Sequence, residues 1–329
     1  MGARSPVYRR RGPDGLQGLA SVLDGGARAA QRRLRSRWAQ RAGAASVPLT
    51  VGLTLARKRI GLHPAAALSL ACAVPLGVAV ALPRGRRRYA AMLASYMWLF
   101  KVSWELPCDD RERLRRRLMI DYPIRFDSWI GGGVPPGVRL QRALRQPGRV
   151  SALDKAVAVA YASWFSPHVL LGYLLARHDE YVPRAGARLA ASYHLTTPFY
   201  WVVPTAPPWW ASEEGGRMNG ELDRVLREVV YDVLKRPAPE HDATPGNPWG
   251  SMPSDHIASA AITAMGLSEI NRAYGALGWG YVGAASFAVV YLGEHYVIDV
   301  LVGLACAELV RRSEPLFAPF VRAVARAVE

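Results

Sequence analysis

The stretch PAAALSLACAVPLGVAVAL, Pro64 to Leu82, decides the fold class. It contains no charged residue, and at about 1.5 Å per residue a helix of this length reaches across the hydrocarbon core of a bilayer. A bilayer selects such a pattern because a charge near its centre is costly. The stretch therefore predicts a membrane-spanning helix.

Further apolar blocks follow along the chain, and the basic residues fall between them. The block from Tyr89 to Leu106 carries Lys101 and Glu105, which lie one helical turn apart, so it is either a span or a segment at the interface. The other blocks contain Tyr, Ser, Thr or His, and we expect their polar faces to look at one another. These blocks cover approximately residues 153–176, 189–203, 257–270, 277–292 and 296–309. The sequence thus predicts an all-α, polytopic membrane bundle of about six or seven transmembrane helices.

The composition agrees with a membrane protein and narrows its partners. Half of the 329 residues are hydrophobic, and the formal charge is +16. Such a charge suits nucleic acid, an anionic membrane surface or a phosphorylated substrate. Because the sequence has no zinc-finger spacing, aromatic RNA-binding motif or helix-turn-helix pattern, we expect no nucleic-acid partner. The three cysteines are too scattered for a disulfide framework.

Charge and proline clusters divide the chain into regions. Residues 1–60, rich in Arg, Gly and Ala, are predicted to be a flexible basic arm on the anionic membrane surface. Residues 61–310 are predicted to form the membrane-embedded domain, with an Arg-rich interfacial collar at 107–150 and a polar active-site loop at 207–253. Residues 311–329 are predicted to be an amphipathic tail.

The motif PSDH, Pro253 to His256, stands at the mouth of one apolar block. Ser254 can cap a helix here, and Asp255 lies in the first turn, where the helix dipole favours an acid. This structural explanation does not require His256. Because free N–H groups at a helix N-terminus also bind phosphate oxygens, Ser254 is a candidate phosphate-binding residue. His256 would stand beside that phosphate with a proton to give or take.

A second histidine follows in HYVID, where His295 and Asp299 are four residues apart. On a helix this spacing puts both on one face, so the carboxylate can orient the imidazole and raise its basicity, as a nucleophile or base requires. Two alternatives stay open: a buried polar lock between membrane helices, or a metal bound by Glu294, His295 and Asp299 together with His256. We expect no metal, because no H-E-x-x-H or paired Cys/His spacing is present.

The two motifs together resemble the type 2 phosphatidic acid phosphatase superfamily. Its members have P-S-x-H followed by H-x-x-x-D, as in PSDH and HYVID here. Within it, PTAPPWW (Pro204 to Trp210), SMPSDH and Tyr296 most resemble the branch that contains fungal inositol phosphorylceramide synthase and its bacterial relatives. The resemblance covers roughly residues 121–310.

The resemblance implies a phosphohistidine mechanism that needs no cofactor and no metal. By the pattern of the superfamily, His295 attacks the phosphorus in line and Asp299 orients it. His256 protonates the leaving oxygen and then activates water or an acceptor alcohol. Because phosphatases and phosphotransferases share this intermediate, the motifs do not choose between them.

Two cations of the superfamily pattern are missing from this chain. The first motif keeps Arg236 and Pro237, but Val229 stands where a lysine is expected. In the third motif, Ala288 and Val289 replace Ser-Arg. Phosphoryl transfer requires the charge on the equatorial oxygens to be neutralised, so other cations must act.

We expect Arg236 and Lys235 to bind the substrate phosphate, with Arg217 and Arg227 as further candidates. All four lie in the polar segment that precedes PSDH. Each can equally be ordinary basic decoration near anionic lipid.

The resulting interpretation is a multi-pass lipid phosphatase of the cell membrane that hydrolyses a lipid-linked phosphate ester. Its expected partner is a membrane lipid with a phosphate or phosphodiester headgroup. A lipid headgroup phosphotransferase of the inositol-phosphoryl type is the first alternative, and a non-catalytic membrane binding or transport protein is the second. Basic residues favour the cytoplasmic side of a membrane. Arg311 and Arg312 follow the last apolar block and predict that the membrane face opposite the active site is cytoplasmic. The Arg-rich collar would lie on the active-site side and predicts the reverse. On family grounds we expect the active site on the extracytoplasmic face.

Overall fold

The computed structural model describes residues 23–327 apart from 24, 29, 32, 35, 84, 147, 166–168, 171–172, 174–176 and 238–245. Its described residues form helices and no strand, which confirms the all-α class. The α-helices are α2 (Arg37–Ala56), α3 (Pro64–Ala81), α4 (Arg86–Glu105), α5 (Arg111–Arg115), α6 (Asp121–Ile130), α7 (Pro136–Leu144), α8 (Ala152–Ala162), α10 (Val182–Val202), α11 (Pro208–Glu213), α12 (Val225–Leu234), α13 (Asp255–Ile270), α14 (Arg272–Tyr291) and α15 (Val297–Ala327). The 3-10 helices are η1 (Leu106–Asp110), η2 (Ser163–Phe165), η3 (Asp179–Tyr181) and η4 (Met218–Gly220).

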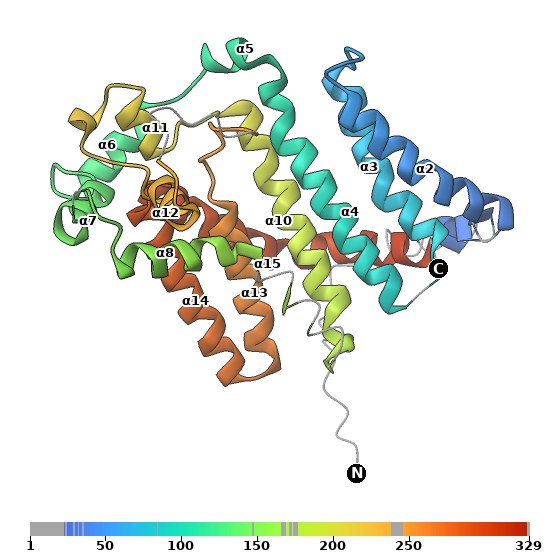
Figure 1. Ribbon diagram of the computed structural model, residues 1–329. Helices are drawn as coiled ribbons and strands as arrows, with labels where there is room; N and C mark the ends of the chain where they lie inside the picture. The colour runs from blue at the N-terminus through green and yellow to red at the C-terminus, as the bar shows by residue number, and fades with distance from the viewer. Residues whose placement is uncertain are drawn as a thin grey trace.

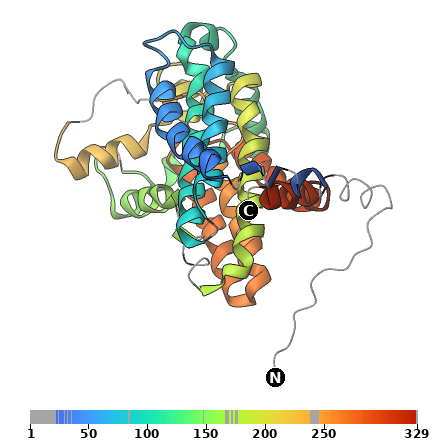
Figure 2. The same cartoon turned by 90° about the vertical axis from the view of Figure 1, so that its right-hand side faces the viewer.

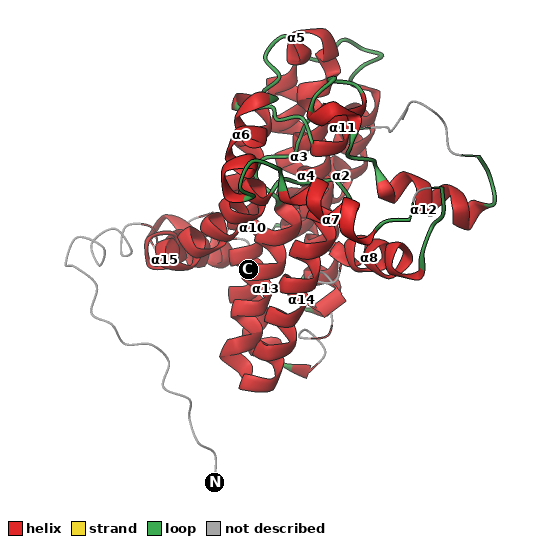
Figure 3. Cartoon of the chain, turned by 90° about the vertical axis from the view of Figure 1, so that its left-hand side faces the viewer, coloured by secondary structure: helices red, strands yellow, loops and turns green. Residues whose placement is uncertain are grey.

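Long helices stand side by side, and the short helices gather around one end of them (Figure 1). Helix α13 is central: α14, α15 and α10 all pack on it, whereas α2 and α3 join the bundle through α4. Helix α12 projects sideways from the bundle, and α15 extends away from it in another direction (Figures 2 and 3). The start of α13, where PSDH lies, is therefore surrounded by other elements.

Small side chains let the central helices approach closely. A Cβ atom on Gly278 of α14 would lie 2.8 Å from the Cα of Ala264 in α13, and one on Gly303 of α15 would lie 2.6 Å from the carbonyl oxygen of Ser254. Apolar residues fill the spaces between these contacts, with Ile257 of α13 and Val289 of α14 completely buried. The close approach at Gly303 fixes the first turns of α15 against the start of α13.

A buried charge network joins the other end of the bundle. Arg188 of α10 is 3% exposed and donates to Glu269 of α13 at 2.8 Å and to Glu314 of α15 at 2.5 Å. Arg184 pairs with the same two carboxylates. Because each charge has a partner, the network holds three helices together without leaving an unpaired buried ion.

Two described helices, α3 and α14, are long and apolar enough to cross a bilayer. The larger number of spans stays a prediction. Helix α13 has 16 residues and α8 has 11, both below the about 20 that a span usually needs. The collar region 107–150 forms η1, α5, α6 and α7, and its position at a membrane surface also stays a prediction.

The region 1–60, predicted to be a flexible arm, contains helix α2, which packs on α3. A Cβ atom on Gly77 of α3 would lie 2.8 Å from Ser46 Oγ of α2, and Thr54 is completely buried. The small residues of α2 permit this close helix pairing. Residues 1–22 of the arm lie outside the described part of the chain.

Candidate active site

His295 lies in the turn that joins α14 to α15. Gly293 has φ +77°, a left-handed conformation that glycine adopts without strain, and this lets the chain reverse after Tyr291. The backbone N–H groups of Glu294 and His295 both donate to the carbonyl oxygen of Val289 at 3.0 Å. The side chain of His295 is 6% exposed, so the turn presents it in a nearly closed site.

Asp299 and Ser251 hold one side of the His295 ring. His295 Nδ1 lies 3.3 Å from Asp299 Oδ2 and 3.4 Å from Ser251 Oγ. The same Asp299 oxygen accepts from the Ser251 hydroxyl and, at 2.9 Å, from the backbone N–H of Tyr296. A carboxylate fixed in this way directs the Nδ1 proton toward itself, so Nε2 of His295 is left as the basic nitrogen.

His256 stands against that basic nitrogen. His295 Nε2 and His256 Nδ1 are 3.3 Å apart, with ring centroids at 5.4 Å. Tyr161 of α8 stacks on His256 at 4.7 Å, and Trp164 of η2 packs at 5.6 Å, so the imidazole has little freedom to turn. The structure thus brings the three predicted catalytic residues into one hydrogen-bonded row.

Ser254 occupies the N-cap position of α13, but its side chain does not cap the helix as expected. Its backbone N–H donates to the carbonyl oxygen of Asp299 at 3.1 Å, while its buried hydroxyl has no hydrogen-bond partner among the described residues. The neighbouring Asp255 accepts from the Tyr200 hydroxyl of α10. Asp255 therefore anchors α13 to α10.

Asp127 of the collar helix α6 caps α15 from outside. It is 1% exposed and accepts from the backbone N–H groups of Val297 at 2.9 Å and Ile298 at 3.1 Å. Burial raises the pKa of Asp127 to about 6, and the charge of Asp299 adds to this, although the two N–H donors oppose it. Since α15 begins at Val297, two residues after His295, Asp127 positions the segment that carries both His295 and Asp299.

The four predicted phosphate-binding cations do not join this row. Arg236 and Lys235 follow the last turn of α12, which projects from the bundle; both are exposed, and Lys235 lies 3.9 Å from Asp232 (Figure 2). Arg217 pairs with Asp121, and Arg227 pairs with Glu213. The last two therefore serve ion pairs with other elements.

A cation that the motifs did not predict lies in the same cluster as the histidines. Arg224, just before α12, donates to Glu294 through Nε at 2.8 Å and Nη2 at 3.3 Å, and its guanidinium lies 4.2 Å from the centroid of the Trp209 ring. Glu294 precedes His295, and the charges of Glu294 and Arg224 both act on the hydroxyl of Tyr161. Because Arg224 falls outside every motif, only the folded chain places it near the site.

No group of three or more His, Cys, Asp and Glu side chains is arranged to hold a metal ion within the described ranges. In particular, the Glu294 carboxylate forms an ion pair with Arg224. The four residues considered as metal ligands are thus divided between an ion pair and a hydrogen-bonded row.

Comparison with known proteins agrees with the geometry. A family model described as the PAP2 superfamily matches residues 124–310, more than half of the chain. The matched segment contains PSDH, HYVID, Asp127 and Arg224. No curated protein and no solved structure matches the chain. The family match and the apolar helices α3 and α14 together indicate association with a membrane.

Proposed function

This chain belongs to the PAP2 superfamily of phosphatase-type enzymes, and on that basis we propose that it is an integral membrane lipid phosphatase acting through a phosphohistidine. One observation carries the proposal. His295 has one ring nitrogen against Asp299 and the other against His256. A nucleophile thus has an orienting carboxylate on one side and a proton carrier on the other.

In the proposed reaction, Nε2 of His295 attacks the phosphorus while the bond to the leaving oxygen breaks. Protonated His256 gives its proton to that oxygen. His256, now neutral, takes a proton from water, whose oxygen attacks the phosphorus as the nitrogen–phosphorus bond breaks and phosphate leaves. In-line displacement puts nucleophile and leaving oxygen on opposite sides of phosphorus, so the two rings must move apart from their 3.3 Å contact when substrate enters.

The start of α13 and Arg224 support the binding of the phosphoryl oxygens. The first N–H groups of a helix lack partners within the helix and favour anions, and the Ser254 hydroxyl, which has no partner among the described residues, lies beside them. Arg224 offers a guanidinium, a shape that matches phosphate oxygens. We assign the charge-neutralising role to Arg224 before Arg236 and Lys235, because its ion pair with Glu294 keeps it next to His295.

A lipid headgroup phosphotransferase is the second candidate. It would use the same intermediate and replace water by an acceptor alcohol. The arginine- and tryptophan-lined hollow described below favours it, since such a hollow can hold a polar headgroup. A multi-pass arrangement in the cell membrane with the site on the extracytoplasmic face remains part of the proposal, supported by the basic residues Arg311 and Arg312 of α15.

The test is product analysis with purified protein. A panel of lipid phosphates is incubated with EDTA present, with and without free inositol, and the products are identified by mass spectrometry. We expect phosphate release that His295→Ala abolishes and His194→Ala, a histidine change on α10 outside the site, preserves. A headgroup-exchanged lipid in the samples with inositol would identify a phosphotransferase. Release that survives His295→Ala, or that EDTA stops, would contradict the phosphohistidine mechanism.

A further inference from the structure

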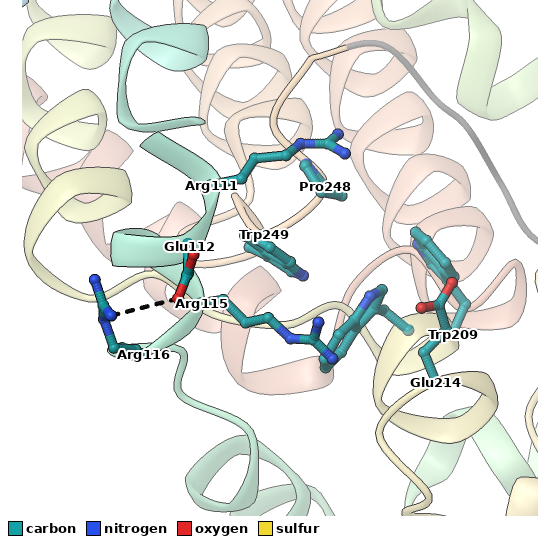
Figure 4. Close-up of a pocket in the computed structure, with 9 residues that line it drawn as sticks. Arg111, Glu112, Arg115, Arg116, Trp209, Glu214, Pro248 and Trp249 are labelled. Carbon is teal, nitrogen blue, oxygen red and sulfur yellow. Dashed lines mark hydrogen bonds and ion pairs between the residues drawn. The ribbon is translucent and has the colours of Figure 1, made fainter. Parts of the chain in front are cut away.

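A hollow lies at the end of the bundle that carries the short helices. It has a volume of about 710 Å³ and is formed by α5, α11 and the segment at Pro248 and Trp249 (Figure 4). Neither α5 nor this segment belongs to the histidine row. The hollow is therefore a separate feature that the proposed reaction does not explain.

The hollow is positively charged. Arg116 on its rim lies 3.4 Å from Glu112, which leaves Arg111 and Arg115 opposite the single carboxylate of Glu214. In the part of the chain that the structure describes, neither Arg111 nor Arg115 makes an ion pair or a side-chain hydrogen bond. Figure 4 shows both guanidinium groups extending over the hollow on either side of Trp249. Two guanidinium groups that line one hollow, with no ion pair to another described residue, favour an anion, and their planar donor pattern matches phosphate.

Indole rings form the remaining walls. Trp209, Trp210 and Trp249 are each more than nine-tenths buried, and Trp210 and Trp249 meet edge to face at 5.9 Å. The Nε1–H of Trp249 is buried and has no acceptor among the described residues, although a buried indole N–H usually has one. Figure 4 shows this nitrogen on the side of the ring that faces the hollow. An oxygen-rich ligand would supply the acceptor.

The position of the hollow indicates where the ligand comes from. Helix α5 follows α4 through η1, and Asp109 of η1 pairs with Arg57 at 2.9 Å, in the turn that leads into the apolar helix α3. The hollow thus lies at the end where α3 begins, which is the level of lipid headgroups if α3 spans a bilayer. Its walls also support the histidines: the N–H of Trp209 donates to Gly293 at 2.9 Å, and Trp249 precedes Ser251 by two residues.

From these observations we infer that the hollow between α5, α11 and Trp249 is a binding site for a phosphate-bearing headgroup, distinct from the histidine pair. Arg111 and Arg115 bind the phosphate, the indole rings pack against the attached polar group, and the Trp249 N–H donates to an oxygen. The inference concerns binding alone, so it holds or fails independently of the proposed reaction.

The test is a binding measurement on the full chain, purified in neutral detergent or in phosphatidylcholine nanodiscs. One arm titrates a non-hydrolysable phosphonate analogue of glycerol 3-phosphate by calorimetry. The other arm measures binding of the detergent-purified chain to phosphatidylcholine vesicles with and without phosphatidic acid. Binding in the first arm identifies a soluble phosphate compound as sufficient, and binding in the second arm alone identifies the lipid headgroup; both support the site.

Matched variants locate the binding. We expect the double change Arg111→Ala with Arg115→Ala to raise Kd at least about tenfold, because charge-assisted contacts are lost. Trp249→Phe keeps an aromatic ring, removes the donor and should raise Kd by a smaller factor. Arg113→Ala, on the same helix but outside the lining, controls for loss of general positive charge and should bind like the unmodified chain.

Three results would overturn the inference. They are no binding in either arm, unchanged Kd in the double variant, and an equal loss in Arg113→Ala, which would indicate general surface charge. Loss of binding in His295→Ala with full binding in the double variant would place the ligand at the histidine pair and would also contradict it. Size-exclusion profiles that match the unmodified chain show that each variant is folded.

Discussion

Replacement of Asp127 by alanine tests whether the collar positions the reaction site. The change leaves the N–H groups of Val297 and Ile298 without their acceptor. A buried donor without a partner costs about 1–3 kcal/mol, so two cost about 2–4 kcal/mol when partial relaxation is allowed. Against this, the carboxylate is itself costly to ionise: its pKa rises from 3.8 to about 6, which corresponds to about 3 kcal/mol at neutral pH.

The sign of the pH effect follows from the raised pKa of Asp127. A carboxyl whose pKa is higher in the folded state stabilises the fold while it is protonated, and this contribution is lost as pH rises from about 4 through 6. At pH 5 roughly half of the 3 kcal/mol is already lost, and most of the rest is lost by pH 7. Asp127→Ala removes the titration, so its stability deficit should be about 1 kcal/mol larger at pH 5 than at pH 7.

The assay combines melting and turnover. At pH 7 the two effects nearly cancel, so Tm should change little, while kcat falls because the segment with His295 and Asp299 is no longer fixed. At pH 5 the Tm gap should widen by roughly 1–2 °C. Asp121→Asn changes an exposed carboxylate on the same helix and is the control. An unchanged kcat together with a Tm gap that does not vary with pH would refute the positioning role of Asp127.

Further changes test the histidine row and its packing. His295→Ala should lower phosphate release at least about a thousandfold, and Asp299→Asn should lower it less, because orientation is easier to lose in part than the nucleophile; both are read from initial rates. Gly303→Ala should reduce turnover and Tm, since its Cβ would lie 2.6 Å from a carbonyl oxygen at the start of α13, whereas Gly280→Ala, with open space around it, should do neither. Arg224→Lys should raise KM or lower kcat by about tenfold, because lysine cannot reproduce the two-point contact; equal kinetics would remove Arg224 from the site.

The helical class and the grouping of His295 with Asp299 could be predicted from the sequence, because both depend on short-range patterns. Apolar blocks between basic segments predict helices, and His295 and Asp299 are four residues apart, so helical geometry alone puts them together. His256 could be added because its motif stands at a helix start. The number of spans stays a prediction: α8 ends at Ala162, well before the end of its apolar block at residue 176, and α13, with 16 residues, is shorter than a usual span.

The supporting residues could not be predicted, because their partners are remote in the chain. Asp127 lies 170 residues before the N–H group of Val297 that it binds. Arg224 and Glu294 are 70 residues apart, and no spacing rule joins them. Arg236 was expected at the site because it belongs to the first motif of the superfamily. A motif does not say in which direction α12 projects, and that direction depends on contacts remote in the chain. Ser251 carried a weak signal, since it stands directly before the Met252–Pro253 segment that leads into the site.

The histidine row and the residues that support it differ in how strictly the chemistry fixes their positions in the sequence. The histidine row needs fixed atoms at fixed distances, so it depends on residues that a motif can record. Charge neutralisation needs only a cation within reach, and a fold can supply it from any element that borders the site.

Val229 stands where the superfamily pattern has a lysine, and Ala288 stands where it has the serine that precedes an arginine. Both residues are buried in one apolar cluster. That cluster lies between α8, α12 and α14, so a lysine at Val229 would face hydrocarbon side chains in this chain. Arg224, at the start of α12 and paired with Glu294, is the cation that we propose in its place. The missing motif lysine and the unpredicted arginine are therefore two results of the same packing of α12.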